Sequence, residues 1–264
     1  MKPYPEYTAV SLYRNNVGTT NYQGLSLSIR QRMSRGLTYS AAYTRSKLTD
    51  IASSVFDASI LTGPLTNAAV ADSHNLERDR DYSTGDIPHY FAASVVWDLP
   101  AGEGRATHPD GVLGALVNDW SVASVMTLQS GVPVAVTQAN SLGYAGFTTQ
   151  RPNLVGDPTL PADERTPAHW FNTAAFATAN QFTIGSASRN PVRGPTYRDA
   201  DFALMRRVGI GGGERAVELR LEVFNLLNTA NFGVPAAQFG PASFGTITSA
   251  LDPRVVQLAA KFWF

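Results

Sequence analysis

The sequence predicts an all-β fold, an antiparallel transmembrane β-barrel segment of about seven to eight strands that does not close on itself. Three observations support this prediction. Apolar and polar residues alternate with period two in several runs, as expected for strands with one apolar face. The runs are about nine to eleven residues long, which suits tilted strands that cross a bilayer. The connections between them alternate between short turns and long loops.

The first three predicted strands each place apolar side chains at every second position. In residues 24–32 these side chains are Leu25, Leu27 and Ile29. Residues 37–44 and 90–99 repeat the spacing with aliphatic and aromatic residues. An extended chain points successive side chains to opposite sides, so each segment has one apolar face.

The next three predicted strands cover residues 120–130, 201–208 and 216–225, and the last of these alternates most regularly. Its apolar positions are Val217, Leu219, Leu221 and Val223. Its charged positions are Glu218, Arg220 and Glu222. We expect the apolar set to face lipid and the charged set to face a water-filled lumen, where cross-strand ion pairing is a simpler role than contact with a solute.

The seventh predicted strand covers residues 255–264 and ends the chain on an aromatic residue. Terminal residues of soluble domains are usually polar and frayed, so an apolar last strand implies a covering surface. Residues 4–14 could supply an eighth strand, although their alternation is poor. Bacterial barrels have an even number of strands, and seven is odd, which is why closure is not expected.

The connections differ in length at the two ends of the predicted sheet. Residues 33–36 and 209–214 form short, turn-like links, whereas residues 47–79, 131–198 and 229–243 form long ones. Outer-membrane barrels have short periplasmic turns and long outer loops. Residues 100–119 break the rule, because this long link lies on the side of the short turns.

Composition excludes several classes of protein. Only 16% of the 264 residues are charged, against about 25% in a typical soluble domain. The net charge is zero, which gives no reason to expect nucleic acid as a partner. There is no cysteine, so disulfides and thiolate metal sites are excluded. The sequence has no run of 18 apolar residues and begins without the regions of a signal peptide.

We expect no enzyme activity, no cofactor and no metal. The phosphate-binding loop and the nucleophile elbow of serine hydrolases are both missing from the sequence. The four histidines lack the spacing of metal ligands. They are His74, His89, His108 and His169.

Two loop features leave alternatives open. The run ERDRD, residues 77–81, could bind calcium at a loop rim, but a solvated charge run is the better interpretation. Four loop aromatics could stack on a sugar ring, although packing within the loop is favoured. They are Tyr144, Phe147, Trp170 and Phe176.

The chain carries, in order, the motifs NYQGLSLSIRQR, RPNLVGDP, WFNTAAF, RNPVRGP, LRLEVFNLLNTANFG and PRVVQLAAKFWF. Together they resemble the carboxyl-terminal part of TonB-dependent receptors, and the Oar-like group most of all. The resemblance covers essentially residues 1–264, as one carboxyl-terminal portion of a barrel domain. Leu258, Phe262 and Phe264 match the signal by which the barrel assembly machinery recognises outer-membrane strands.

The resemblance implies a larger protein in the outer membrane of a Gram-negative bacterium. By this resemblance, the parent protein would have a 22-stranded barrel and an amino-terminal plug that contacts TonB. This chain carries no plug, no TonB-contacting box and no signal peptide, so we expect a truncated gene product or a fragment. Its expected partners are outer-membrane lipid, the barrel assembly machinery, the missing plug and strands, and TonB through the parent protein.

The implied function is movement of a large solute across the outer membrane, with the solute and the direction left open. The alternative is a secreted, soluble all-β binding or adhesion module, in which two sheets pack their apolar faces together. Dependence on detergent would separate the two classes.

Overall fold

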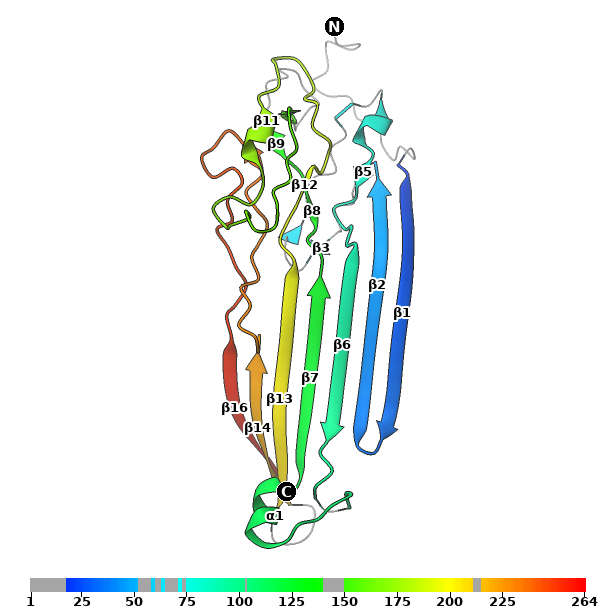
Figure 1. The fold of residues 1–264 in the computed structure, drawn as a ribbon, viewed down its shortest axis with the longest axis vertical. Helices are drawn as coiled ribbons and strands as arrows, with labels where there is room; N and C mark the ends of the chain where they lie inside the picture. Colours follow the sequence, from blue (N-terminus) through cyan, green and yellow to red (C-terminus); the bar gives the residue numbers. More distant parts are fainter. Residues whose placement is uncertain are drawn as a thin grey trace.

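A computed structural model of the chain describes residues 18–51, 58–59, 63–64, 71–72, 75–102, 104–139, 150–210 and 215–264. Its main feature is one tall antiparallel sheet (Figure 1). The long strands are β1 (Thr20–Ser34), β2 (Leu37–Asp50), β6 (His89–Asp98), β7 (Trp120–Gln129), β13 (Tyr197–Gly209), β14 (Ala216–Phe224) and β16 (Val255–Trp263). All seven predicted strands are therefore confirmed.

The long strands pair in chain order, β1-β2-β6-β7-β13-β14-β16. A short eighth strand, β5 (Asp81–Tyr82), pairs with the end of β2. The possible strand at residues 4–14 lies outside the described residues. In the described part of the chain β1 and β16 are the two edges and do not pair with each other, so the sheet is open, as predicted.

The pairing register aligns the apolar side chains of all seven strands on one side. Leu221 of β14, for example, lies opposite Leu204 of β13 and Leu258 of β16. We call this side the apolar face. Its members are Leu25, Leu27, Ile29, Tyr39, Ala41, Tyr43, Phe91, Ala93, Val95, Trp97, Val122, Met126, Leu128, Phe202, Leu204, Val217, Leu219, Leu221, Val223, Val256, Leu258, Ala260 and Phe262.

The opposite side, which we call the polar face, is lined mostly by small and charged residues, although Val96 and Val125 also lie on it. Hydroxyl groups pair across its strands, with 2.9 Å between Ser26 Oγ and Thr44 Oγ1 and 2.9 Å between Ser40 Oγ and Ser94 Oγ. Cross-strand hydroxyl pairs stabilise a sheet face without apolar packing. One side of the sheet is thus suited to water and the other is not.

The apolar face is uncovered in the described part of the chain. Leu25 is 61% exposed and Leu258 is 79% exposed. In a soluble sandwich a second sheet would bury such side chains about 10 Å away. Their exposure argues against the soluble alternative and fits strands whose apolar side meets lipid.

The connections match the predicted asymmetry. Arg35 and Gly36 form a two-residue turn between β1 and β2 with φ angles of 52° and 78°, as in a type I′ hairpin. At the same end β13 and β14 are joined closely, with Ile210 N donating to Arg215 O at 2.9 Å. The long link over residues 100–119 contains a helix that the alternation did not predict, α1 (Gly111–Val117). No helix in the described residues is long and apolar enough to span a membrane.

The long connections gather at the other end of the sheet (Figure 1). We call the described residues 75–88, 131–139, 150–196 and 225–254 the loop cap. It contains only short elements: η1 (Leu76–Asp79), β5, β8 (Pro133–Val134), β9 (Thr137–Gln138), β10 (Asn153–Leu154), η2 (Thr173–Ala175), β11 (Phe176–Ala177), β12 (Val192–Arg193) and β15 (Gln238–Phe239). A further short pair, β3 (Ala58–Ser59) with β4 (Gly63–Pro64), lies in the connection after β2.

The loop cap has its own apolar core. Its buried members are Val134, Val136, Phe171, Ala175, Phe176, Ala187 and Val192. Phe171 and Phe244 meet edge to face with ring centroids 5.0 Å apart, and Phe239 packs on Phe244 at 5.3 Å. Such aromatic pairs add to the stability from burial alone. The parallel pairing of β9 with β15 also joins the second long connection to the third.

Candidate functional site

The loop cap is fastened by three Arg–Asp ion pairs. The pairs are Arg151–Asp79, Arg189–Asp50 and Arg193–Asp86. In each pair the arginine belongs to the connection between β7 and β13, and the aspartate belongs to β2 or to the connection that follows it. Two long connections are therefore locked together at the upper end of the sheet.

The Arg151–Asp79 pair is the most deeply buried. The Asp79 side chain is fully buried, and Arg151 Nη2 donates to Oδ1 of this carboxylate. The other oxygen, Oδ2, accepts from the backbone N of Ala71 at 2.9 Å. A buried charge is tolerated only when it is paired and hydrogen-bonded, and both carboxylate oxygens of Asp79 have partners.

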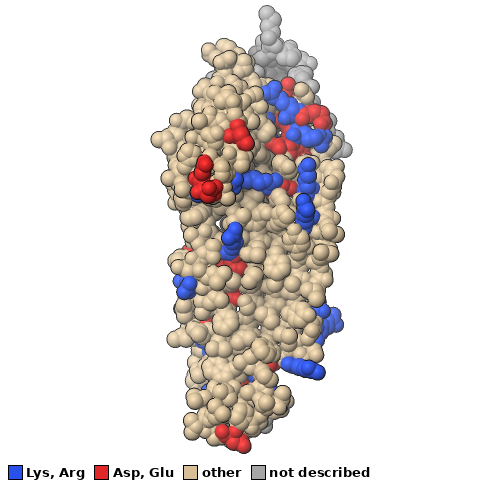
Figure 2. Space-filling model, in the orientation of Figure 1, with Lys and Arg blue, Asp and Glu red and all other residues tan. Residues whose placement is uncertain are grey.

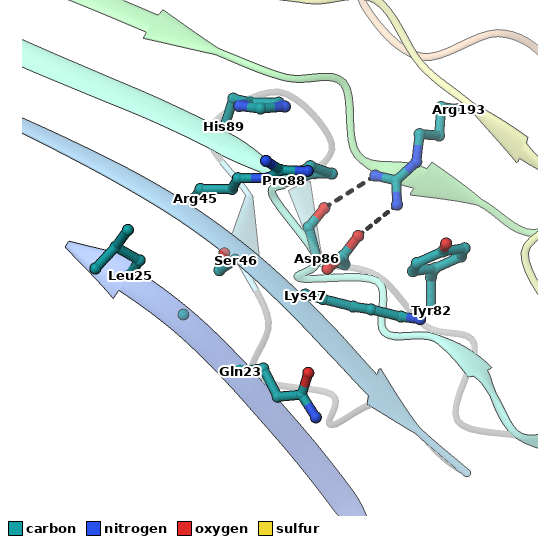
Figure 3. A pocket seen from close by; sticks show the side chains of 11 residues that line it. Gln23, Leu25, Arg45, Ser46, Lys47, Tyr82, Asp86, Pro88, His89 and Arg193 are labelled. Carbon is teal, nitrogen blue, oxygen red and sulfur yellow. Dashed lines mark hydrogen bonds and ion pairs between the residues drawn. The ribbon is translucent and has the colours of Figure 1, made fainter.

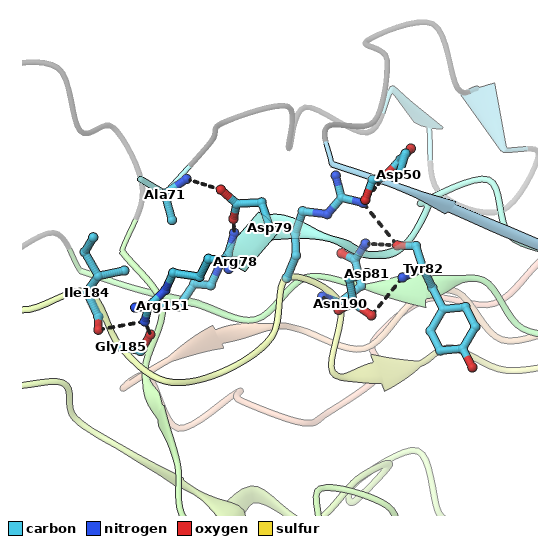
Figure 4. A network of polar contacts seen from close by, with 11 residues as sticks. Asp50, Ala71, Arg78, Asp79, Asp81, Tyr82, Arg151, Ile184, Gly185 and Asn190 are labelled. Carbon is cyan, nitrogen blue, oxygen red and sulfur yellow. Dashed lines mark hydrogen bonds and ion pairs between the residues drawn. The ribbon is translucent and has the colours of Figure 1, made fainter. Parts of the chain in front are cut away.

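The Arg189–Asp50 pair lies in a network that also holds β5 (Figure 4). Arg189 Nη2 donates to Asp50 Oδ1 and, at 3.3 Å, to the backbone O of Tyr82. The neighbouring Asn190 uses its Nδ2 to donate to the same Tyr82 oxygen at 2.6 Å, and its backbone N to donate to Asp81 Oδ2 at 2.8 Å. Residues 189–190 therefore hydrogen-bond both to the backbone and to a side chain of β5.

The third pair lines a hollow of about 490 Å³ where the strands meet the loop cap (Figure 3). Arg193 Nη2 donates to Asp86 Oδ2, and its guanidinium lies 4.7 Å from the centroid of the Tyr82 ring. Lys47 Nζ lies 5.6 Å from the same ring. Two cations therefore lie close to the Tyr82 ring, and the negative face of an aromatic ring attracts cations.

The rest of the hollow is amphipathic. Leu25 brings the apolar face to its edge, and Arg45 and Lys47 are exposed cations on the same side of the next strand. His89 also lines it, with 2.7 Å between its Nδ1 and the hydroxyl oxygen of Tyr43. The hollow can therefore accept a group that is apolar at one end and a hydrogen-bond acceptor at the other.

The loop cap carries exposed charged side chains as well as the buried pairs. In Figure 2 the blue and red atoms gather at the upper end of the molecule, and the middle of the strands is mostly uncharged. Within this region Arg80 donates to both carboxylate oxygens of Glu77, at 2.6 and 2.9 Å. This hydrogen bonding holds the pKa of the exposed Glu77 below its ordinary value of 4.5.

The run ERDRD therefore differs from the expected solvated charge run. Only Glu77 and Arg80 form an exposed pair, whereas Asp79 is buried and Arg78 donates to the backbone oxygens of Ile184 and Gly185. Through Arg78 and Asp79 the run joins the connection after β2 to the connection after β7. Among the described residues no group of three or more histidine or acidic side chains could hold a metal ion.

The two predicted sets of residues on β14 lie on opposite faces. Val217, Leu219, Leu221 and Val223 belong to the apolar face. Glu218, Arg220 and Glu222 belong to the polar face, where Arg220 pairs with Glu222 at 3.0 Å and with Glu218 at 3.7 Å. These ion pairs run along one strand, not across strands as expected. Contact of the first set with lipid and of the second with a lumen stays a prediction.

The predicted assembly residues lie on the edge strand β16 or directly after it. Leu258 and Phe262 belong to the apolar face and are exposed, and Phe264 follows the strand at the end of the chain. Their recognition by the assembly machinery stays a prediction.

The loop aromatics serve packing where the structure describes them. Phe176 is buried in the core of the loop cap, and Trp170 packs against that core with its Nε1 donating to Arg193 O at 2.8 Å. Tyr144 and Phe147 lie outside the described residues, as does His74. The two described rings therefore take the packing role that the sequence favoured.

Sequence reasoning missed the three Arg–Asp pairs. Arg151 and Arg189 do stand next to Pro or Asn in the motifs RPNLVGDP and RNPVRGP, which could have signalled a buried cation, whereas Arg193 stands between Val192 and Gly194. Their aspartates are 72 to 139 residues away, so no local pattern joins the partners. The pairing becomes visible only when the loops are in place.

An open antiparallel sheet with one exposed apolar face and long loops gathered at one end defines a membrane β-barrel segment. A family model described as "Outer membrane beta barrel domain" matches residues 1–257, and the chain belongs to this family. A search of curated proteins found no match, and a search of solved structures found none either. The protein is located in the outer membrane.

Proposed function

We propose that the chain is the carboxyl-terminal barrel portion of a TonB-dependent receptor of the Oar-like group. The observation that carries this proposal is the joint resemblance of strand and loop motifs, in order, to that class. The cap built from RPNLVGDP, WFNTAAF and RNPVRGP supports it, because these motifs supply the buried arginines and the aromatic core. Loops fixed in this way can present a constant surface to a large solute.

The proposed activity is movement of a large solute across the outer membrane, without catalysis and without a cofactor. The open sheet contributes one side of a wider barrel, with its polar face toward the lumen. The plug, the remaining strands and TonB are proposed partners that act through the parent protein. The barrel assembly machinery is proposed to read Leu258, Phe262 and Phe264.

The test combines the upstream DNA with a capture experiment. We expect the reading frame before Met1 to encode a plug domain with a TonB-contacting box. Outer membranes that carry the full-length product should then retain the purified periplasmic domain of TonB, and deletion of the box should abolish retention. A full-length protein that has no plug, or that does not retain TonB, would overturn the proposal while leaving the outer-membrane location intact.

A further inference from the structure

The link between β6 and β7 has a feature that solute movement does not explain. The described residues 100–102 and 104–119 belong to a long connection at the end of the sheet where the other turns are short. Such turns face the periplasm in outer-membrane barrels. The link carries α1, which lies at the end opposite the loop cap (Figure 1).

The link is fastened to the sheet by hydrogen bonds. Arg105 Nη1 donates to the backbone oxygens of Leu99 and Trp120, at 2.8 and 2.6 Å, where β6 ends and β7 begins. Asn118 Nδ2 donates to Pro109 O at 3.0 Å and closes the link around α1. Gly114 approaches Pro109 so closely that an added Cβ would lie 2.0 Å from its oxygen. The helix therefore has a defined position.

The carboxyl end of α1 is held by two side chains on the apolar side of the sheet. Trp120 Nε1 donates to Leu116 O at 2.7 Å. Arg206 donates to Asn118 O at 3.1 Å and to Ala115 O. Trp120 and Arg206 are register partners and share the side of Val122 and Leu204, which belong to the apolar face. The helix is thus attached to the strand ends on the side of the apolar face.

The free side of α1 is apolar and exposed. Val112 is 80% exposed, Leu113 is 61% exposed and Leu116 is 63% exposed. Together with Val117 they follow the spacing i, i+1, i+4, i+5, which places them on one side of a helix. The helix GVLGALV contains no charged residue. Exposure of this surface to water would be unfavourable, because the free energy falls when an apolar side chain leaves water.

We propose that α1 is an interfacial membrane anchor, with Val112, Leu113, Leu116 and Val117 inserted into the periplasmic leaflet of the outer membrane. The exposed apolar side of α1 continues the apolar face past the strand ends through Trp120. Trp is enriched at membrane interfaces and Arg can serve as an anchor there, and here both also supply the donors that satisfy the last carbonyl groups of the helix. The proposal rests on the outer-membrane location and not on a role for TonB.

The chain has no cysteine, so single-cysteine variants can be labelled cleanly. Leu113→Cys and Leu116→Cys would carry an environment-sensitive fluorophore, with the exposed Ala106→Cys of the same link as the matched control. The full-length protein would be placed in phosphatidylethanolamine vesicles whose acyl chains are brominated. We expect quenching at positions 113 and 116 to be several-fold greater than at position 106, with a blue-shifted emission. Labels at Leu219 and Leu221 of the apolar face report that the barrel has inserted.

Two results would overturn the proposal. One is equal, weak quenching at positions 106, 113 and 116, with all three open to aqueous iodide, which means that α1 lies in water. The other is protection of positions 113 and 116 from both quenchers, which means that another protein covers the helix. A Leu113→Gln/Leu116→Gln variant with the label at Val112→Cys should lose its lipid quenching, while quenching at Leu221→Cys persists.

Discussion

One step along β14 moves a side chain from one face of the sheet to the other. Leu221 faces Leu204 and Leu258 on the apolar face, whereas Arg220 lies on the polar face and pairs with Glu218 and Glu222. This arrangement could be predicted residue by residue, because the position of a residue in a strand decides which face its side chain is on. Substitutions at neighbouring positions should therefore have very different costs.

Leu221→Arg should lower the unfolding free energy of the full-length protein by roughly 2–4 kcal/mol if the site lies near the bilayer midplane. Arg220→Leu should cost under about 1 kcal/mol, because the side chain is partly exposed and water can resolvate Glu218 and Glu222. Unfolding by urea in lipid vesicles measures both. A packed protein core would also reject arginine at position 221, so a second measurement is needed.

Lipid-quenched fluorophores at positions 217–223 supply that measurement. Quenching should rise and fall with period two, and be highest at the apolar positions. If those positions are shielded from lipid and the charged positions are equally dry, the strand belongs to a protein core and the lipid-facing prediction is wrong.

The buried arginines offer a second comparison between single residues. Arg151→Met leaves the Asp79 carboxylate buried without its cation, which should cost about 3–5 kcal/mol. Hydrogen exchange of the loop-cap amides should speed up accordingly. The double variant Asp79→Leu/Arg151→Met should recover part of the protection, because a buried ion pair can be replaced by apolar residues of similar volume.

The matched control is Glu77→Gln, two residues before Asp79, which removes the exposed pair with Arg80. Exchange in the loop cap should stay close to that of the unmodified protein. Equal effects of Arg151→Met and Glu77→Gln would show that burial of the pair does not matter.

At the scale of elements, period two located the strands but not their ends. β2 continues to Asp50, although the apolar alternation stops near residue 44. Backbone pairing with β1 does not depend on apolar side chains, so polar residues such as Lys47 extend the strand without a signal in the pattern. α1 escaped prediction because seven residues are too few to show helical periodicity.

The hairpin between β1 and β2 depends on its turn residues. Gly36→Val should cost about 1–2 kcal/mol or more, because φ is +78° and the new Cβ would lie 2.7 Å from Asp98 O. Arg35→Asn should be neutral or slightly stabilising, since Asn tolerates the φ of 52° found there. The urea midpoint and the folding yield in vesicles compare the two variants. Equal stability of both would contradict the assigned turn.

At the scale of the whole molecule, the fold was largely predictable and the loop cap was not. Strand order follows chain order, because each strand pairs with its neighbour in the sequence. The cap depends on contacts such as Arg189 with Asp50, which no periodic pattern encodes. The strands could be predicted from their repeating pattern, whereas the ion pairs between distant loops could not.

The open sheet leads to a prediction for residues 1–264 expressed alone. In the part of the chain that the structure describes, the outer edges of β1 and β16 present unpaired backbone groups, which lipid does not tolerate and which promote aggregation in water. We expect no discrete, stable channels in planar bilayers made with this chain. Steady unitary currents that require the chain would show that it closes into a pore.

The three Arg–Asp pairs also set an order of assembly in time. The sheet can grow one hairpin after another, but the pairs join residues 72, 107 and 139 positions apart. Contacts of such long range form slowly, because closing a long loop costs conformational entropy before the contact can stabilise the chain. Newly made protein should therefore pass through a stage in which its strands are paired and its outer loops are still cut readily by proteases.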